Sequence, residues 1–245
     1  MARVKLLNIE IDNLTMDEAL KEIDTFIIEK KNALVVTPNV DHLVKVENDK
    51  EFRKIYNEAD LILTDGMPLI WISKFKSIDI KEKISGSDLF PQVCDLASKR
   101  SYKLYLLGGK PEASEKAAEK LVEKYPGLNI VGKYSPYYGF EKDVREIEHV
   151  IKLINDAKPD ILAVGLGAPK QEKFIYNYRH KLQVPVSLAI GASIDFESGL
   201  VSRSPVWMQK SGLEWFYRMC KEPKRMIRRY LFDDMKIFKL LFKYK

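Results

Sequence analysis

Over its first 200 residues the chain alternates short apolar runs with amphipathic helical patterns, and this alternation restricts the fold more than any other feature. The apolar runs are nearly continuous, as in residues 33–37, 103–107 and 161–164. Continuous apolar runs are typical of strands buried on both faces, and strand–helix alternation is typical of a sheet covered by helices. We therefore predict an α/β fold in which a mostly parallel sheet is flanked by helices.

Local signals place the first elements along the chain. Residues 4–11 are predicted to form a strand. Thr15 and Glu18 have the spacing of a capping box, which predicts the start of a helix. A second short strand is predicted over residues 61–64, and Pro68 is expected in the first turn of the helix that follows.

The charge is divided unequally along the chain. The whole sequence has a formal net charge of +6, but the segment from Arg203 to Lys245 alone holds 12 basic and 4 acidic side chains. The first 202 residues are therefore slightly acidic, whereas the end of the chain is basic and rich in aromatic residues. This division indicates two parts with different functions, so we predict a core over residues 1–200 and an appendage over residues 201–245.

The appendage has a basic amphipathic helical pattern from Pro223 onward. Its apolar side is made of Ile227, Leu231, Met235, Phe238, Leu241 and Phe242. Its basic side is made of Arg225, Arg229, Lys236, Lys239 and Lys243, with Arg228 at the edge. We favour a helix that lies on an anionic membrane surface. Packing on the body or self-association is the second interpretation, and nucleic acid is a third that the acyl-like apolar side disfavours.

The cysteine content and the lengths of the apolar segments indicate the cellular compartment. The two cysteines, Cys94 and Cys220, exclude a disulfide scaffold and a four-cysteine zinc site, and they fit a reducing compartment. Charged and polar residues interrupt the apolar pieces near the start of the chain before they reach the length of a signal peptide. No stretch of about 18 apolar residues lacks a charge, so we expect a cytoplasmic protein without a transmembrane helix.

Glycine clusters follow two of the predicted strands. Ligands of parallel sheets usually bind at the carboxyl ends of the strands, where these clusters fall. Gly108-Gly109 precedes a predicted helix and is a candidate phosphate cradle, and Gly165-Leu-Gly-Ala-Pro169 repeats the arrangement. Neither matches a dinucleotide fingerprint or a Walker A loop, and tight turns alone would explain the glycines equally well. The pair of turns together favours a nucleotide-type ligand.

Asp65 is the carboxylate most suited to chemistry, since it follows a predicted buried strand. A carboxylate there is a candidate general base, metal ligand or cap for the helix containing Pro68. The three histidines, His42, His149 and His180, have no metal-ligand spacing, so no metal site is predicted. No Ser-His-Asp order or nucleophilic cysteine signature is present either.

Considered together, the motifs resemble those of the WecG/TagA/CpsF glycosyltransferases. The resemblance covers about residues 4–232 and rests on several motifs in a fixed order. They are Thr37-Pro-Asn-Val-Asp-His42, Thr64-Asp-Gly-Met-Pro68, Ser85-Gly-Ser-Asp-Leu89, Leu106-Leu-Gly-Gly109, Gly165-Leu-Gly-Ala-Pro-Lys-Gln-Glu172, Gly191-Ala-Ser-Ile-Asp-Phe196, Arg203-Ser-Pro-Val-Trp-Met-Gln209, Gly212-Leu-Glu-Trp-Phe-Tyr-Arg218 and Glu222-Pro-Lys-Arg-Met-Ile-Arg-Arg-Tyr230.

The resemblance implies a hexosyltransferase with a Rossmann-like fold. It implies inverting, metal-independent transfer of N-acetylmannosamine from UDP-ManNAc to undecaprenyl-diphosphate-GlcNAc, in β-1,4 linkage, as an early step of wall teichoic acid synthesis. It further implies no cofactor, self-association, and a peripheral position on the inner face of the cell membrane. A family member with another donor sugar, such as N-acetylmannosaminuronic acid or glucose, and a non-catalytic nucleotide-binding membrane module are the alternatives.

Under this interpretation we assign chemical roles to individual residues. Inverting transfer needs a base on the acceptor hydroxyl, and Asp65 is our choice. The departing UDP would be stabilised by Arg203 and by the Gly108-Gly109 turn. Thr37 and Asn39 would orient the sugar.

Further candidates lie later in the chain. Gln171 is expected to bind sugar hydroxyls or the uracil ring. Arg218, Arg225 and Arg228 are expected to hold the diphosphate of the lipid acceptor. Because these arginines belong to the appendage, we expect the active site to be complete only when the appendage meets the membrane.

Overall fold

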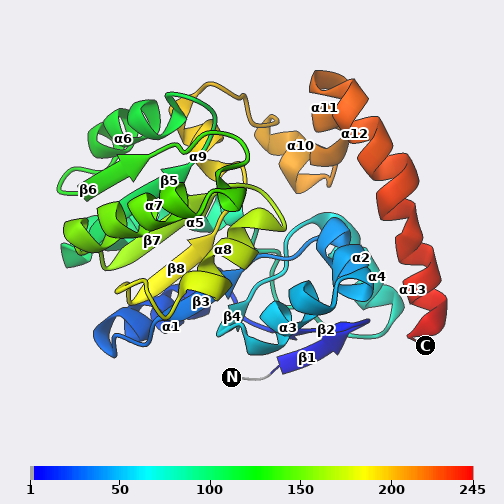
Figure 1. Cartoon of the computed structure of the whole chain (residues 1–245). Coiled ribbons are helices and arrows are strands. Elements are labelled where there is room, and N and C mark those ends of the chain that lie inside the picture. Colours follow the sequence, from blue (N-terminus) through cyan, green and yellow to red (C-terminus); the bar gives the residue numbers. More distant parts are fainter. Residues whose placement is uncertain (1–2, 245) are drawn as a thin grey trace.

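The computed structural model describes residues 3–244, without the side chains of Lys210 and Arg225. Its centre is a six-stranded sheet in which every neighbouring pair of strands is parallel, with the order β4-β3-β8-β7-β5-β6 (Figure 1). The strands are β3 (Ala33–Val36), β4 (Leu61–Ile62), β5 (Lys103–Gly108), β6 (Asn129–Tyr134), β7 (Ile161–Gly165) and β8 (Val186–Ala189). The predicted parallel α/β architecture is confirmed.

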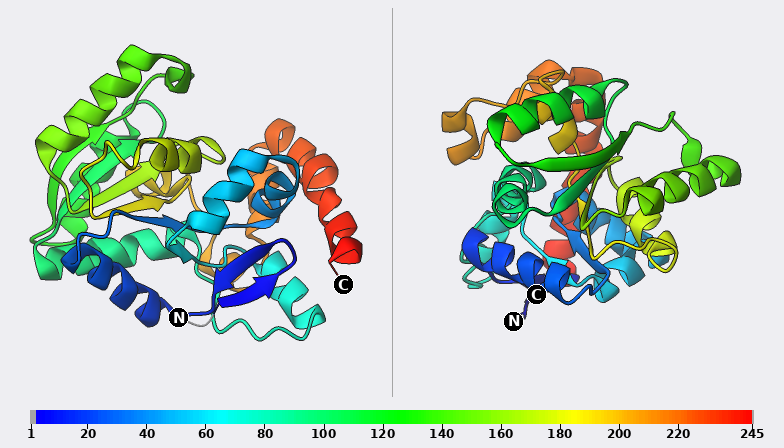
Figure 2. Two further views of the ribbon diagram at one scale, coloured as in Figure 1. Left: turned by 60° about the horizontal axis from the view of Figure 1, so that its bottom comes forward. Right: turned by 90° about the vertical axis from the view of Figure 1, so that its left-hand side faces the viewer.

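Helices cover both faces of this sheet, and each face has its own apolar layer. One layer includes α1 (Met16–Ile28), α5 (Gly86–Arg100), α6 (Ala113–Lys124) and α9 (Ser193–Ser198). The other includes α2 (Val40–Asn48), α3 (Lys50–Glu58), α7 (Val144–Ala157), α8 (Lys170–Tyr178) and the short η1 (Phe140–Lys142). Two views of the ribbon show the sheet between these layers (Figure 2). Burial on both faces explains the continuous apolar runs.

The first predicted strand is wrong, because residues 4–11 form a hairpin. Strands β1 (Arg3–Leu6) and β2 (Ile9–Asp12) pair antiparallel in a sheet of their own. Leu7 turns the chain with a positive φ of 56°, and the Asn8 side chain donates to the Leu43 carbonyl at 2.9 Å, which ties the turn to α2. Because Leu7 is itself buried, the apolar run continues through the turn and hides it.

Two predicted helix starts are confirmed. The Thr15 hydroxyl accepts from the Glu18 amide at 3.3 Å, and the Glu18 carboxylate accepts from the Thr15 amide at 2.8 Å. This capping box begins α1. Helix α4 (Met67–Phe75) carries Pro68 in its first turn.

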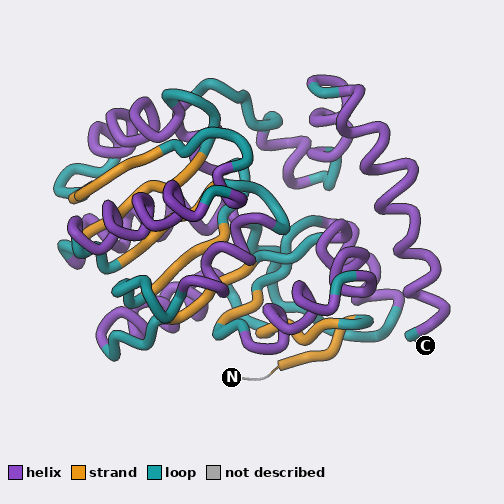
Figure 3. Tube along the Cα trace, viewed as in Figure 1, coloured by secondary structure: helices purple, strands orange, loops and turns teal. Residues whose placement is uncertain are grey.

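The chain leaves the sheet after α9 and continues as a C-terminal arm, residues 201–244. The arm is almost entirely helical (Figure 3) and runs along the side of the molecule past α2 and α4 (Figure 1). Its elements are α10 (Val206–Lys210), α11 (Glu214–Lys221), α12 (Pro223–Arg228), the π-helical η2 (Arg229–Asp233), the 3₁₀ turn η3 (Asp234–Lys236) and α13 (Ile237–Lys243). The predicted amphipathic helix is therefore not one continuous α-helix, since a π-helical and a 3₁₀ segment over residues 229–236 separate α12 from α13.

The arm packs on the body with a different face from its predicted apolar side. Met226, Ile237 and Leu240 are the buried apolar residues after Pro223 in the described part of the arm. Most of the predicted apolar side instead remains outside: Ile227, Leu231, Met235, Phe238 and Phe242 are 41 to 74% exposed, whereas Leu241 packs partly against the body. Packing on the body therefore does not explain this stripe. In the described part of the chain, no helix combines the length and apolarity needed to cross a bilayer.

Candidate active site

A cleft of about 1350 Å³ opens at the carboxyl ends of the strands. Turns that follow β3, β4, β5, β7 and β8 line it, together with the loop over residues 134–141. The arm closes one side with Arg218, Met226, Arg228 and Arg229. The site therefore lies where a parallel sheet is expected to bind its ligand, and the appendage contributes to it.

Asp65 lines this cleft and does not cap the next helix. Gly66, with a φ of 93°, is the N-cap of α4, and no side chain caps that helix. Burial raises the pKa of Asp65, and the positive charge of Arg218 offsets this only in part. The Asn39 amide donates to the Asp65 carboxylate at 3.4 Å. A carboxylate with a raised pKa at the mouth of a cleft is suited to accept a proton.

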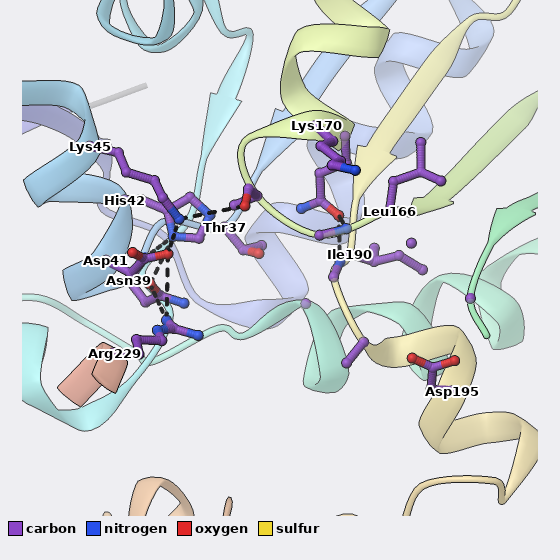
Figure 4. Close-up of a pocket in the computed structure, with 18 of the residues that line it drawn as sticks. Thr37, Asn39, Asp41, His42, Lys45, Leu166, Lys170, Ile190, Asp195 and Arg229 are labelled. Atoms are coloured by element: carbon purple, nitrogen blue, oxygen red, sulfur yellow. Dashed lines mark hydrogen bonds and ion pairs between the residues drawn. The ribbon is translucent and has the colours of Figure 1, made fainter. Parts of the chain in front are cut away.

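Asn39 is the point where several elements meet (Figure 4). Its carboxamide oxygen accepts from Arg229 of the arm at 3.1 Å and lies 2.8 Å from His42 Nδ1. The neighbouring Thr37 donates from its hydroxyl to the Ala189 carbonyl at 3.4 Å, which joins the ends of β3 and β8. Thr37, Asn39 and Asp65 are thus brought together as predicted.

Neighbouring segments of the protein pack closely against the first glycine turn, Gly108-Gly109. A Cβ on Gly108 would lie 2.7 Å from the Gly165 carbonyl oxygen, and a Cβ on Gly109 would lie 2.8 Å from Ala113 Cβ. Both glycines have positive φ, 102° and 85°. The Gly109 amide already donates to the Gly165 carbonyl at 2.9 Å, so it is committed within the protein. Close packing of two turns is therefore what these glycines provide here, and Gly109 also lines the cleft.

Two other glycines border open space: Gly167, in the second glycine turn that the sequence offers as a candidate phosphate cradle, and Gly191, which follows β8. Gly167 and Gly191 line the cleft with φ of 75° and 57°, and a Cβ on either would meet no atom within 4 Å. Gln171, 3% exposed, joins their turns because its carboxamide oxygen accepts from both glycine amides, at 3.2 and 3.0 Å. Glycine spacing alone does not reveal which glycine faces a ligand.

Arg203 lies behind the cleft wall. Its guanidinium donates to Asp88 at 2.6 Å and to the Ser87 carbonyl at 3.0 Å, and Ser87 lines the cleft. Although burial opposes it, the charges of Lys83 and Arg203 lower the pKa of Asp88 to about 2. Arg203 thus fixes the loop that begins α5 in this structure.

The arginines of the arm take different positions. Arg218 is held by Glu214 at 2.9 Å and lines the cleft, where its charge acts on Asp65. Arg228 also lines the cleft and is exposed. The side chain of Arg225 lies outside the described residues. Arg229, which the sequence analysis did not assign to the site, makes the direct contact with Asn39.

Cations are available on the opposite wall as well. Lys110 and Lys170 line the cleft, and Lys170 pairs with Glu141 at 2.5 Å and lies over the Tyr138 ring. Neither lysine was assigned a role from the sequence. Among the residues that the structure describes, no group of three or more His, Cys, Asp and Glu side chains is arranged to hold a metal ion.

A parallel sheet with a strand-end cleft that holds a carboxylate of raised pKa among cations is suited to bind an anionic ligand and to accept a proton. The comparison with known sequences specifies the family: the profile of the glycosyl transferase WecG/TagA/CpsF family matches residues 4–245, and the chain belongs to this family. The resemblance seen in the sequence motifs is confirmed.

Named relatives are similar over most of the chain. The N-acetylglucosaminyldiphosphoundecaprenol N-acetyl-beta-D-mannosaminyltransferase of Bacillus subtilis (strain 168) is 34% identical over 205 residues, which cover 82% of this chain and 78% of the relative. The protein of the same name from Bacillus spizizenii (strain ATCC 23059 / NRRL B-14472 / W23) is 32% identical, covering 82% and 76%. That of Staphylococcus aureus (strain MRSA252) is 28% identical, covering 92% and 87%.

Proposed function

We propose that this chain transfers N-acetylmannosamine from UDP-ManNAc to undecaprenyl-diphosphate-GlcNAc, forming a β-1,4 bond with inversion. The observation that carries the proposal is Asp65, a carboxylate of raised pKa that lines the cleft between the sheet and the arginines of the arm. The names of the relatives supply the donor sugar and the acceptor. Residues 1–200 form the transferase core and residues 201–245 the appendage.

Asp65 acts as the general base in this proposal. It takes the proton of the GlcNAc 4-hydroxyl while that oxygen attacks C1 of the donor sugar, opposite to the UDP. The C1–oxygen bond to UDP breaks, and its electron pair leaves with the β-phosphate. One base is sufficient, since inversion needs no covalent intermediate. Thr37 and Asn39, which border Asp65, hold the sugar in line.

The leaving diphosphate gains negative charge in the transition state, and preorganised cations stabilise it most where water is excluded. Lys110 and Lys170 on the sheet side and Arg218 on the arm side provide such charges around the cleft. Arg203 acts indirectly by holding the Ser87 loop. The open space at Gly167 and Gly191 gives the donor room to approach the backbone. Transfer is proposed to need no metal ion.

The lipid acceptor is proposed to approach along the arm. Arg228 faces both the cleft and a shallow groove on the arm that also contains Lys224 and Ile227. An arginine at this point suits a diphosphate, since its planar group binds phosphate oxygens in pairs. The exposed stripe of the arm would lie in the inner face of the cell membrane, with Arg225 and Arg228 toward the lipid phosphates.

Release of UDP tests the catalytic proposal. The purified chain is incubated with UDP-ManNAc and a short-chain lipid analogue of diphosphate-GlcNAc, with and without EDTA. We expect UDP and a β-1,4 disaccharide product only when the acceptor is present, at equal rates in both buffers. Parallel assays with UDP-N-acetylmannosaminuronic acid and UDP-glucose test the alternative donors. Faster transfer from one of these would replace the proposed donor, and loss of activity in EDTA would contradict metal-independent transfer.

Sedimentation with vesicles tests the membrane proposal. Vesicles of 30% anionic phosphatidylglycerol in phosphatidylcholine should bind the chain, and pure phosphatidylcholine should bind it weakly. The double variant Phe238→Ser/Phe242→Ser should lose most binding because both side chains belong to the exposed stripe. Ile28→Ser is the matched control, since Ile28 is 68% exposed and belongs to α1, a helix on the opposite side of the molecule from the arm (Figure 1). If the double variant binds vesicles as the wild-type chain does but forms fewer oligomers, the exposed stripe is instead an interface with a second copy of the chain.

A further inference from the structure

A histidine and a glutamate are buried together next to the part of the cleft that contains Asp65, the proposed general base. His42 on α2 is 6% exposed and Glu172 on α8 is 1% exposed. His42 Nε2 lies 3.4 Å from a carboxylate oxygen of Glu172, and the imidazole packs against the rings of Phe52 and Tyr56. The catalytic steps proposed above use neither residue.

Hydrogen bonds extend from this pair in both directions. On one side, His42 Nδ1 lies 2.8 Å from the carboxamide oxygen of Asn39, whose amide donates to Asp65. On the other side, Gln171 donates to the same Glu172 oxygen at 2.8 Å.

The second branch ends at the glycine turns. The Gln171 carboxamide oxygen accepts the amides of both turns, Gly167 and Gly191. A continuous line of side chains therefore connects the carboxylate that takes the proton with the turns that border the open part of the cleft.

Stability alone does not account for this line. A buried pair of charged or polar groups costs desolvation and is often no more stable than an apolar pair of the same size. One Glu172 oxygen, Oε2, has no hydrogen-bond partner within the described residues, which adds to that cost. Contacts along a line of polar side chains do, however, restrict the orientation of the groups that they join.

We propose that His42 and Glu172 are positioning residues that orient Asn39 against Asp65 and hold the two glycine turns at a fixed distance from this base. The proposal rests on the proposed transfer reaction, since it assigns Asp65 as the base. Arg229 of the arm also donates to the Asn39 carboxamide oxygen. When the arm is packed on the body, this hydrogen bond further restricts the orientation of the Asn39 side chain.

A purely structural role is the alternative. His42 is the third residue of α2, and its Nδ1 lies 3.2 Å from the Asn39 backbone nitrogen, as in a capping box. A cap stabilises the start of the helix by about 1 kcal/mol and leaves the chemistry of Asp65 unchanged. The two roles therefore differ in what they do to the chemical step.

A matched pair of variants of the full chain separates these roles. In His42→Asn the side-chain amide nitrogen replaces Nδ1 and keeps the contact with Asn39, whereas in His42→Gln it replaces Nε2 and keeps the contact with Glu172. Both variants lose the ring packing against Phe52 and Tyr56, so the Tm of both should fall. We expect kcat for transfer to fall about 30-fold in His42→Gln and about 3-fold in His42→Asn, with KM for the donor within twofold in both.

The pH profile of kcat provides a second readout. The charged groups that act on Asp65 are Arg218 and Glu214 on α11, Lys83 before α5 and His42 on α2. Losing the well-oriented Asn39 amide removes a hydrogen bond to the ionised carboxylate, so the acidic limb should move to higher pH in His42→Gln and stay in place in His42→Asn.

The outcomes are distinguishable from those of the proposed function. If the wild-type chain releases UDP only with acceptor, but the two variants have equal kcat values or an unmoved acidic limb, the positioning proposal is wrong and the capping role stands. If the wild-type chain transfers no sugar from any of the donors, the proposed function itself is wrong. Glu172→Gln keeps an acceptor for Gln171 but weakens the contact with His42, so it should lower kcat about 3-fold, as His42→Asn does; wild-type turnover in this variant would also overturn the proposal.

Discussion

The sheet and the C-terminal arm are stabilised in different ways. Every residue of β3 and β8 is buried, whereas no residue of α11 is buried. The arm buries the apolar side chains of Met208, Met226, Ile237 and Leu240 among its described residues. It is also attached through polar contacts such as Arg203 with Asp88, Arg229 with Asn39 and Lys243 with Glu47. Burial of each large apolar side chain contributes about 1.5–3 kcal/mol, whereas an exposed ion pair contributes about 0–1 kcal/mol. We therefore expect the arm to separate from the body at lower cost than a central strand such as β3 or β8, whose residues are all buried.

This difference divides the work of the active site. The sheet supplies groups whose positions must not change, namely Asp65 and the glycine turns. The arm supplies Arg218, Arg228 and Arg229, and its most apolar side faces outward. An arm with an outward apolar stripe is suited to respond to a surface, so we propose that the body carries the chemistry and that the arm completes the site.

The largest effect is expected when the body loses its base. Asp65→Asn should lower kcat for transfer by about 10²–10⁴-fold, the range that general-base catalysis contributes. UDP binding, measured by calorimetry, should stay within twofold, because the amide has nearly the same shape. Transfer at the wild-type rate by Asp65→Asn would show that Asp65 is not the general base. It would also contradict the proposal that the body carries the catalytic groups.

Removing the arm after Gly199 should leave a folded core that binds UDP. Turnover should fall by about 100-fold or more, since Arg218 and its neighbours leave the cleft. The cooperative thermal transition of the core and its UDP affinity are the controls for folding. A truncated chain as active as the intact protein would show that the arm has no part in catalysis.

A single contact tests whether the arm acts through the body. Arg229→Met removes the charged donor that reaches Asn39, and the loss of one such hydrogen bond corresponds to about a tenfold fall in kcat. Lys221→Met, at an exposed residue of α11 that lines neither the cleft nor the groove on the arm, is the control and should change kcat by less than twofold. Equal effects of the two variants would show that only the net charge of the arm matters.

The smallest effect concerns how tightly the arm is seated. Burial, only partly offset by Arg229, raises the pKa of Asp234 to about 6 from 3.8. The seated arm then holds this proton more tightly than the free arm, so stability falls as pH rises between about 4 and 6 and remains lower above. Asp234→Asn should therefore strengthen seating at pH 7 by about 1 kcal/mol, measured as slower proteolysis of the arm. Faster proteolysis of the arm in Asp234→Asn at pH 7 would contradict this. It would mean that the ion pair between Asp234 and Arg229 stabilises the seated arm by more than burial of the Asp234 carboxylate destabilises it.

Much of the body could be predicted because its elements are specified locally. The capping box at Thr15, the position of Pro68 and the buried runs each depend on neighbouring residues. The hairpin at residues 3–12 could not be predicted, because buried Leu7 continues the apolar pattern through the turn. In the arm, the two aspartates that interrupt the basic run face cations, Asp233 with Lys236 at 3.2 Å and Asp234 with Arg229 at 3.7 Å.

The predicted site was partly assembled as expected. Thr37, Asn39 and Asp65 meet because parallel strands bring their carboxyl ends to one edge. Gln171 instead joins two turns, and only the fold reveals that Gly167 and Gly191 face open space. The roles of these residues depend on neighbours far away in sequence.

The order of apolar and polar residues by itself determined the parallel sheet, the edge that carries the site and the basic character of the arm. Only the tertiary structure decided which side of the arm packs, that Arg229 is the arginine that reaches Asn39, and that His42 and Glu172 are buried as a pair. The physical reason is that periodicity records what each residue does in its own helix or strand. Side-chain partners across the cleft are set by how separate elements pack, and no local pattern specifies that packing.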